Sequence, residues 1–126
     1  MWMLSLLAIC AAPRVVINEV NYHPANDDDR LQYVELHNAG DAEADLSGWK
    51  LRGVKFDFPS KARIGAREFL VVARDVQALQ RVHGTSFAVI GNLPGRIKRG
   101  GEKLELVNAM GQVVESFTFS DDGRGR

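Results

Sequence analysis

The sequence contains a single cysteine, Cys10, in 126 residues. One cysteine excludes a disulfide within the chain and excludes a cysteine-rich metal site. The fold must therefore be held by a hydrophobic core, and a chain of this length can bury one. The hydrophobic fraction of 45% is ordinary for a soluble globular domain.

A net charge is also absent, because 16 basic residues balance 16 acidic residues. The totals therefore indicate neither a nucleic-acid nor a membrane partner. The distribution is uneven. Residues 15–45 hold eight acidic and one basic residue, a net charge of −7, and residues 46–103 hold four acidic and twelve basic residues, a net charge of +8. These parts either neutralise each other across strands or form two opposed surface patches, one of which meets a partner.

The apolar run Met1–Ala12 is too short to span a bilayer, which takes about 20 residues. It is typical of the apolar core and small-residue end of a secretory signal peptide, although no Lys or Arg precedes it. A first strand is the alternative. We assign residues 1–13 to a signal-like segment outside the fold. This assignment predicts an extracellular or cell-envelope protein that does not span the membrane.

The sequence lacks the spacings of common active sites. Its histidines, His23, His37 and His83, fall in separate segments without the short spacing of a zinc site. No serine lies in a nucleophile-elbow pattern, and Cys10 lies outside the predicted domain. We therefore predict that the chain is not an enzyme and that it uses no cofactor and no small-molecule substrate.

What the sequence does contain is a series of short alternating or apolar runs separated by turn residues. They predict strands over residues 15–20, 31–38, 46–51, 55–58, 68–73, 87–90, 102–108 and 112–120. Residues 75–83 predict one helix, with Asp75 as its N-cap and Gly84 as its C-cap. This pattern predicts an all-β sandwich with one short helix.

Period-two alternation also predicts which side chains face the core. Trp49 is expected to be a buried anchor, because an indole buries more area than a neighbouring side chain could. Glu115 interrupts the last alternating run and marks a bulge or an edge. The inward-facing residues are expected to include Val34, Leu36, Leu51, Leu104, Leu106, Val113, Phe117 and Phe119.

Several short stretches follow one another in an order and spacing that is characteristic of one family. They are Ile17–Asn21 (INEVN), Tyr33–Asn38 (YVELHN), Asp45–Leu51 (DLSGWKL), Phe58–Pro59, Phe69–Ala73, Gly101–Leu106 and Gly111. Together they resemble the lamin-tail domain family in its bacterial form, over residues 14–122. The resemblance implies an immunoglobulin-like β-sandwich without an active site. The shared residues that carry it are expected to be structural: Asn18, Glu19, Glu35, Asn38, Gly48 and Trp49.

Physical roles for these residues follow from their types. Glu35 is expected to find backbone N–H groups, Arg30 or Lys50 as partners, because a buried carboxylate needs them. The asparagines are expected at strand ends, where short amides satisfy turning backbone. Gly48 is expected to allow a close approach or a positive φ.

The resemblance also implies an interaction role, since bacterial members occur in exported or surface proteins. Such members often continue past the last strand, so the chain is predicted to be a fragment of a larger protein, with residues 123–126 as a loose tail. The predicted function is a non-catalytic interaction or accessory module that binds another protein or a cell-surface component.

One alternative is a Ca²⁺-binding loop at residues 26–29. Asp27, Asp28 and Asp29, helped by Asn26, Glu19 or His23, supply the hard oxygen ligands that Ca²⁺ prefers. The spacing is not that of an EF-hand, and consecutive side chains point in different directions. A solvated acidic loop is therefore the simpler interpretation.

A second alternative is DNA binding through the basic loop 96–103. Arg96, Lys98, Arg99 and Lys103 could attract phosphates, and such binding would weaken strongly with salt. No aromatic residue interleaves this cluster, so base stacking from it is not expected. The simpler interpretation is a solvated, glycine-rich loop.

Overall fold

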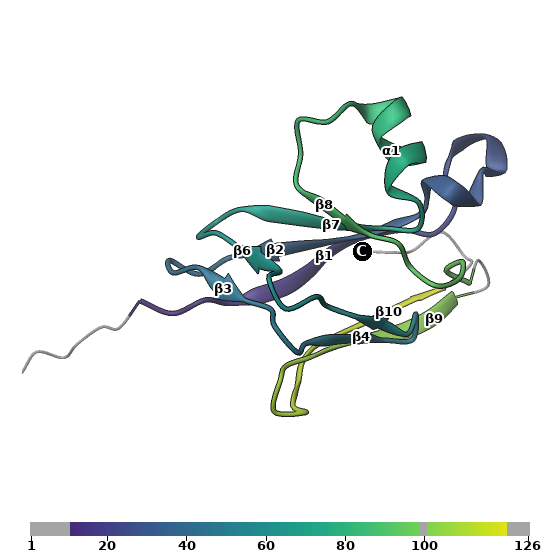
Figure 1. Ribbon diagram of the computed structural model, residues 1–126. Helices are drawn as coiled ribbons and strands as arrows, with labels where there is room; N and C mark the ends of the chain where they lie inside the picture. The colour runs from purple at the N-terminus through teal and green to yellow at the C-terminus, as the bar shows by residue number, and fades with distance from the viewer. Residues whose placement is uncertain (1–10, 99–100, 121–126) are drawn as a thin grey trace, which may run out of the picture.

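Two four-stranded sheets face each other in the computed structural model, which describes residues 11–98 and 101–120 (Figure 1). The first sheet has the order β1–β2–β7–β8: Val15–Asn21, Tyr33–Asn38, Phe69–Ala73 and Val89–Gly91. The second has the order β10–β9–β4–β5: Val113–Ser120, Gly101–Val107, Lys50–Arg52 and Phe56–Asp57. A short pair, β3 (Ala44–Asp45) with β6 (Arg63–Ile64), lies at one end.

The core lies between the two sheets, where alternate side chains of each strand meet. Val34 and Leu36 of β2 are fully buried, as are Leu104 and Leu106 of β9, so these inward-facing predictions are confirmed. Each such side chain contributes about 1.5–3 kcal/mol by leaving water. The largest fully buried apolar side chains are Phe117, Ile17, Leu36, Leu46, Leu51, Ile64, Leu79, Leu93, Ile97, Leu104 and Leu106.

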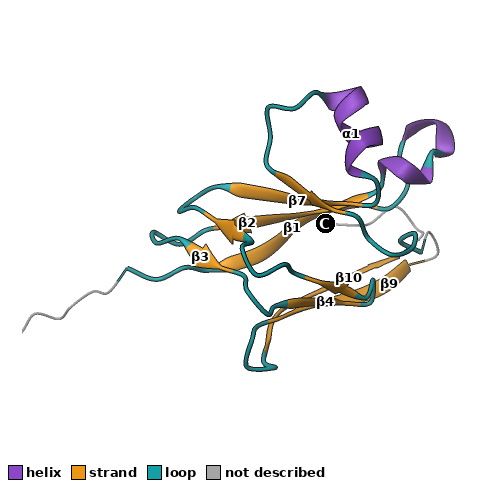
Figure 2. Ribbon diagram, in the orientation of Figure 1, coloured by secondary structure: helices purple, strands orange, loops and turns teal. Residues whose placement is uncertain are grey.

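Strand β7 is an interior strand of the first sheet and is buried on both faces from Leu70 to Ala73, which explains its continuous apolar sequence. Its outer face is covered by α1 (Val76–His83), which connects β7 to the parallel strand β8 (Figures 1 and 2). The Asp75 side chain caps this helix by accepting from the Ala78 N–H at 3.0 Å. Gly84, with φ 85°, closes the other end by donating to the Gln80 carbonyl at 2.8 Å.

The loop before β2 contains two short 3₁₀ turns, Ala25–Asp27 and Asp29–Leu31. The strand predicted over residues 31–38 therefore begins two residues later, because Leu31 belongs to the second turn. Asp28 caps that turn by accepting from the Arg30 N–H at 3.1 Å.

Strands β9 and β10 form the predicted hairpin, but the prediction that Val113 faces inward is wrong. Its side chain is 46% exposed, whereas Phe117 and Phe119 are buried. The register shifts between Val113 and Glu115, which is the predicted bulge. One extra residue reverses the side-chain alternation on the far side of the bulge.

Trp49 packs against the core, as predicted, but it is only half-buried, so the prediction of a buried anchor is confirmed in part. It precedes β4 and follows Gly48, whose φ of 77° confirms the predicted backbone conformation. The Trp49 N–H donates to the Leu46 carbonyl at 3.0 Å, so the backbone of Trp49 lies in a turn before β4. Leu51, two residues later, enters the core instead.

Asn38 is fully buried and satisfies the turns around it, as predicted for an asparagine at the end of a strand. Its Oδ1 accepts from the backbone N–H groups of Arg14 and Gly40, each at 3.0 Å. Its Nδ2 donates to the carbonyls of Ala42 at 2.8 Å and Ile64 at 3.0 Å. One amide therefore joins the start of β1, the end of β2 and the end of β6.

Three predictions concern residues outside the described ranges: most of the signal-like segment 1–13, Arg99, and the tail 123–126. Within the described ranges, Ala12 exchanges hydrogen bonds with Asp41 at 3.1 and 3.2 Å, so the fold begins slightly before residue 14. No helix within residues 11–98 or 101–120 is long and apolar enough to cross a membrane.

Candidate functional site

The outer face of the first sheet, away from the core, carries half-buried polar and aromatic side chains. Tyr33, Glu35 and His37 of β2 point to this face, because they alternate with the buried residues of the same strand. The register places Tyr33 beside Ala73, Glu35 beside Val71 and His37 beside Phe69. The face therefore combines an acidic group with an apolar neighbouring strand.

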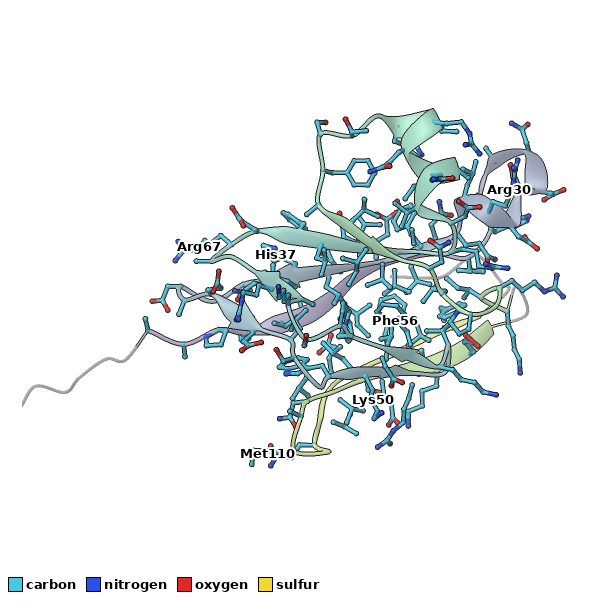
Figure 3. The ribbon with its side chains drawn as sticks, in the orientation of Figure 1. Arg30, His37, Lys50, Phe56, Arg67 and Met110 are labelled. Carbon is cyan, nitrogen blue, oxygen red and sulfur yellow. The ribbon has the colours of Figure 1, made fainter. Side chains whose placement is uncertain are left out.

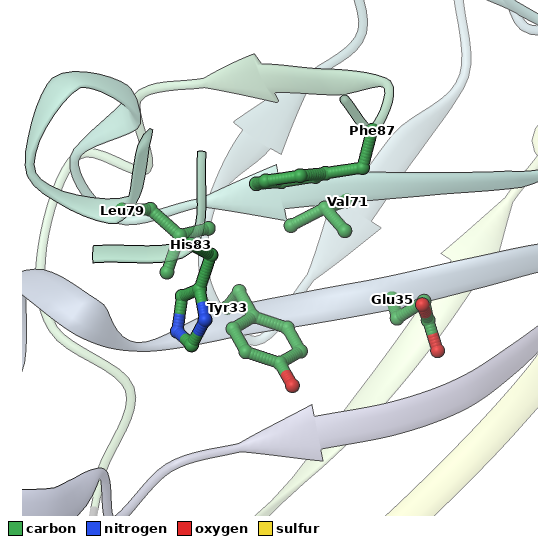
Figure 4. Close-up of a pocket in the computed structure, with 6 residues that line it drawn as sticks. All are labelled: Tyr33, Glu35, Val71, Leu79, His83 and Phe87. Atoms are coloured by element: carbon green, nitrogen blue, oxygen red, sulfur yellow. The ribbon is translucent and has the colours of Figure 1, made fainter. Parts of the chain in front are cut away.

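Helix α1 and the loop after it turn one end of this face into a pocket. The pocket has a volume of about 180 Å³ and is lined by Tyr33, Glu35, Val71, Leu79, His83 and Phe87. In Figure 4 the ring of Phe87 lies above Val71 and the ring of Tyr33 lies below it, with Glu35 to the right. Leu79, from α1, packs with Val71 and closes the side nearer the helix.

Carboxylates gather beside this pocket. Glu19 of β1 lies directly opposite Glu35 of β2 in the register, and like charges in that position repel each other. Within the described residues, neither carboxylate forms an ion pair with a lysine or arginine. The acidic groups of this face are therefore not neutralised by the chain's own described cations.

Hydrogen bonds hold these two carboxylates in place. The Asn18 amide donates to Glu35 Oε1 at 2.8 Å, which corrects the expectation that Arg30, Lys50 or a turn would do so. Asn18 reaches Glu35 because it lies at a bulge inside β1, between Ile17 and Glu19, and not at a strand end. The Tyr33 hydroxyl is hydrogen-bonded to Glu19. Burial raises the pKa of Tyr33 to about 12, and the charges of Glu19 and Glu35 add to the rise.

At the other end of the face, an aromatic pair is open to solvent. Phe69 is 46% exposed, and its ring stacks on His37 with centroids 4.2 Å apart. The His37 ring is fixed by a contact of 3.2 Å between its Nδ1 and the Glu68 carbonyl. His37 pairs with Phe69, the first residue of β7, and Figure 3 shows His37 away from Arg30 and the helical end of the molecule. Exposed aromatic area of this kind is enriched where proteins meet partners.

A second group of exposed apolar side chains lies at the β9–β10 turn. Met110 is 79% exposed, and Val113 and Val114 are 46% and 41% exposed. None of these three residues lines the pocket described above. The outer face of the first sheet offers apolar area, charge and a cavity together, so we take it as the candidate site.

The three aspartates predicted as calcium ligands contact different side chains. Asp27 lies 3.1 Å from His23, Asp28 forms a two-point pair with Arg30, and Asp29 lies 3.5 Å from Arg96. Arg30 also lowers the pKa of Asp28 through this pair. Within residues 11–98 and 101–120, no three His, Cys, Asp or Glu side chains are grouped to hold a metal ion.

The predicted basic loop is divided between separate partners. Arg96 lies 3.5 Å from Asp29, and Lys103 lies 3.5 Å from Glu105 on β9. Lys98 lies beside Glu102, where burial raises the pKa of Glu102 and the lysine opposes that rise. Arg99 is outside the described residues. Part of the basic middle of the chain thus neutralises the acidic part, as one of the two charge interpretations expected.

No pattern in the sequence indicates the pocket itself. Phe87 was expected to begin a strand, but β8 begins at Val89, and the loop carries the Phe87 ring over β7 instead. Segments that are distant in the sequence form the pocket. The aromatic side chains of Phe87 and Tyr33 are therefore the only signal that could have suggested that these two residues lie together.

The family model described as Lamin Tail Domain matches residues 10–121, nearly the whole chain. No curated protein matches the chain.

Proposed function

This chain belongs to the Lamin Tail Domain family, and we propose that it is a non-catalytic interaction module that binds another protein through the outer face of its first sheet. The observation that carries the proposal is that exposed aromatic area, a pocket and unneutralised carboxylates occur together on that face. Protein interfaces characteristically combine an apolar, aromatic centre with a polar rim.

Selection from a random peptide library on the immobilised full chain tests this proposal. Enriched peptides are expected to lose at least about tenfold in affinity for Phe69→Ser, because an aromatic anchor dominates such contacts. Val114→Ser is the matched control, since Val114 is similarly exposed on the opposite sheet. Loss on the control variant alone would move the site to the β9–β10 turn. A library that yields no specific peptide would contradict the proposal.

The proposal extends to export, which the apolar composition of Met1–Ala12 supports. Residues 1–30 fused to a reporter enzyme that is active only outside the cytoplasm are expected to give activity. The same fusion without residues 1–12 is expected to give none. Equal activity from both fusions would refute export through this segment, without bearing on the binding face.

The alternative of DNA binding has less support from the geometry. Two of the four basic residues assigned to it, Arg96 and Lys103, already lie within ion-pair distance of carboxylates of the same chain. An ion pair must be exchanged for each phosphate contact, which reduces the gain from releasing counterions. The calcium alternative likewise has no gathered set of ligands in the described loop.

A further inference from the structure

We propose that the pocket beneath α1 holds the guanidinium group of an arginine side chain presented by the bound protein. This inference rests on the proposed function, since it names the chemistry of the partner at the same face. Size, charge and ring arrangement each support it independently.

The size of the pocket limits the occupant to one side chain. Pockets that enclose a cofactor or a drug-sized ligand have volumes of about 300–1,000 Å³. This pocket has about 180 Å³ and opens on the sheet face. A partner can therefore insert one residue, while the rest of its segment stays on the surface beside β2.

The charge around the pocket selects a cation. Glu35 lines the pocket and Glu19 lies directly opposite Glu35, so two carboxylates repel each other at this site. Their hydrogen bonds come from neutral groups, the Asn18 amide and the Tyr33 hydroxyl. A cation inserted beside Glu35 would relieve the repulsion, whereas an acidic or purely apolar side chain would not.

The rings favour a planar cation over a compact one. Tyr33 and Phe87 lie on two sides of the pocket, with the aliphatic Val71 between them (Figure 4). A guanidinium stacks on aromatic faces and can make two parallel hydrogen bonds to a carboxylate such as Glu35. A lysine ammonium is more strongly hydrated and cannot make the paired contact.

The neighbouring aromatic pair specifies a second position in the partner. Along β2, Glu35 and His37 lie two residues apart on one face, so an extended segment alongside would match them at the same spacing. The exposed ring of Phe69 stacks on His37 and would receive an apolar side chain. The recognised sequence is therefore an arginine and an apolar residue separated by one residue.

Titration of the ¹⁵N-labelled full chain with Nα-acetyl-arginine N-methylamide tests the pocket directly. Backbone amide signals of Tyr33, Glu35, Val71 and Phe87 are expected to shift with saturation. The citrulline analogue, which has the same shape without the charge, is expected to bind at least about tenfold more weakly. Equal binding of both analogues would overturn the inference, and so would equal binding of the lysine analogue.

Variants separate the roles of charge and ring. Glu35→Gln keeps an acceptor for Asn18 and is expected to weaken arginine binding about tenfold. Phe87→Leu is expected to weaken it about threefold. Glu43→Gln, an exposed carboxylate away from the pocket lining, is the matched control and should leave binding unchanged. An unchanged affinity in Glu35→Gln, with an unchanged urea midpoint, would refute the inference.

Failure here can be told apart from failure of the proposed function. Library peptides that need Phe69 but contain no arginine would leave the binding face in place and refute the arginine pocket. Peptides that need Phe69 and lose at least about tenfold in affinity when their arginine becomes citrulline would support both.

Discussion

A fully buried glutamine, Gln32, connects three separate segments of the fold. Its Nε2 donates to the carbonyls of Tyr22 and Ile97, each at 2.9 Å, and its Oε1 accepts from the Ile97 N–H at 2.7 Å. The Gln32 side chain thereby links the loop before β9, at Ile97, to the residue that follows β1, Tyr22, through hydrogen bonds to their backbones. A buried polar group is inexpensive only when it is satisfied in this way.

Gln32→Leu is expected to destabilise the chain by about 2–4 kcal/mol. The substitution removes the hydrogen bonds that the Gln32 side chain makes to two backbone carbonyls and one backbone N–H, and each loss costs about 1–3 kcal/mol before relaxation. Urea unfolding followed by the fluorescence of the two tryptophans measures the change. Gln77→Leu on the exposed side of α1 is the control, expected within about 0.5 kcal/mol of the parent chain. Equal midpoints for the parent and Gln32→Leu would contradict the connecting role.

Asp45 is a carboxyl whose lowered pKa has a clear geometric cause. It accepts from the Ser47 hydroxyl and from the Ser47 N–H at 2.9 Å, and it lies 3.1 Å from Arg63. These contacts, with the Ser47 hydroxyl the largest, lower the pKa of Asp45 to about 2. A lowered pKa in the folded state stabilises the fold at pH values above the ordinary value near 3.8. That contribution is lost as the pH falls through about 2.

Ser47→Ala is therefore expected to raise the pKa of Asp45 toward its ordinary value. Carboxyl ¹³C chemical shifts followed against pH measure it in the folded chain. Arg63→Gln is expected to cause a smaller rise, because the arginine makes a weaker contribution than the serine. A larger rise in Arg63→Gln would reverse the assigned order of causes.

At the scale of elements, Gly53 sets the distance between the β4–β5 hairpin and β9. Its φ is 103°, and a Cβ at this position would lie 2.6 Å from the Lys103 carbonyl oxygen and 2.8 Å from Leu104 Cδ2. The backbone of one strand thus occupies the space that a side chain on the other would need. Gly111, with φ 82° at the β9–β10 turn, has no atom within 4 Å of such a Cβ.

This difference predicts unequal costs for two chemically identical substitutions. Gly53→Ala is expected to destabilise by about 2–4 kcal/mol, from strain at positive φ together with the clash. Gly111→Ala bears the strain alone and is expected to cost about 1 kcal/mol. Thermal unfolding of both variants gives the comparison. Equal losses of stability in the two variants would show that β9 moves aside and that the close contact at Gly53 adds nothing to the cost of the substitution.

Local patterns predict elements that obey a regular period and fail where the period breaks. The immunoglobulin-like sandwich with one short helix is confirmed, since alternation in β2 and β9 and the caps of α1 follow from neighbouring residues. Val113 is misplaced because the bulge near Glu115 adds a residue. Trp49 packs against the core but lies in a turn before β4 and is only half-buried. The pocket depends on where a crossover helix brings Phe87, which no local pattern encodes.

At the scale of the whole molecule, the charge separation seen along the sequence becomes a difference between surfaces. The outer face of the first sheet carries Glu19 and Glu35 without a described cation. The second sheet carries lysines and arginines that are largely matched, as in Lys50 with Asp57 at 2.9 Å and Arg52 with Glu105 at 3.2 Å. Glu19 and Glu35, which form no ion pair with a described lysine or arginine, therefore place acidic charge at the candidate site.

This arrangement predicts weak binding to duplex DNA with a shallow dependence on salt. A protein that neutralises Z phosphates loses affinity with a slope near −0.9Z against the logarithm of salt concentration. With Arg96 and Lys103 held by carboxylates, the basic loop is expected to give a slope shallower than about −3. Fluorescence anisotropy of a labelled duplex at about 50 and 200 mM salt measures the slope. Asp29→Asn, which removes the partner of Arg96, is expected to strengthen binding and steepen the slope. Micromolar binding by the parent chain that is lost at the higher salt concentration would contradict this prediction. It would favour the basic loop, in place of the outer face of the first sheet, as the main binding surface.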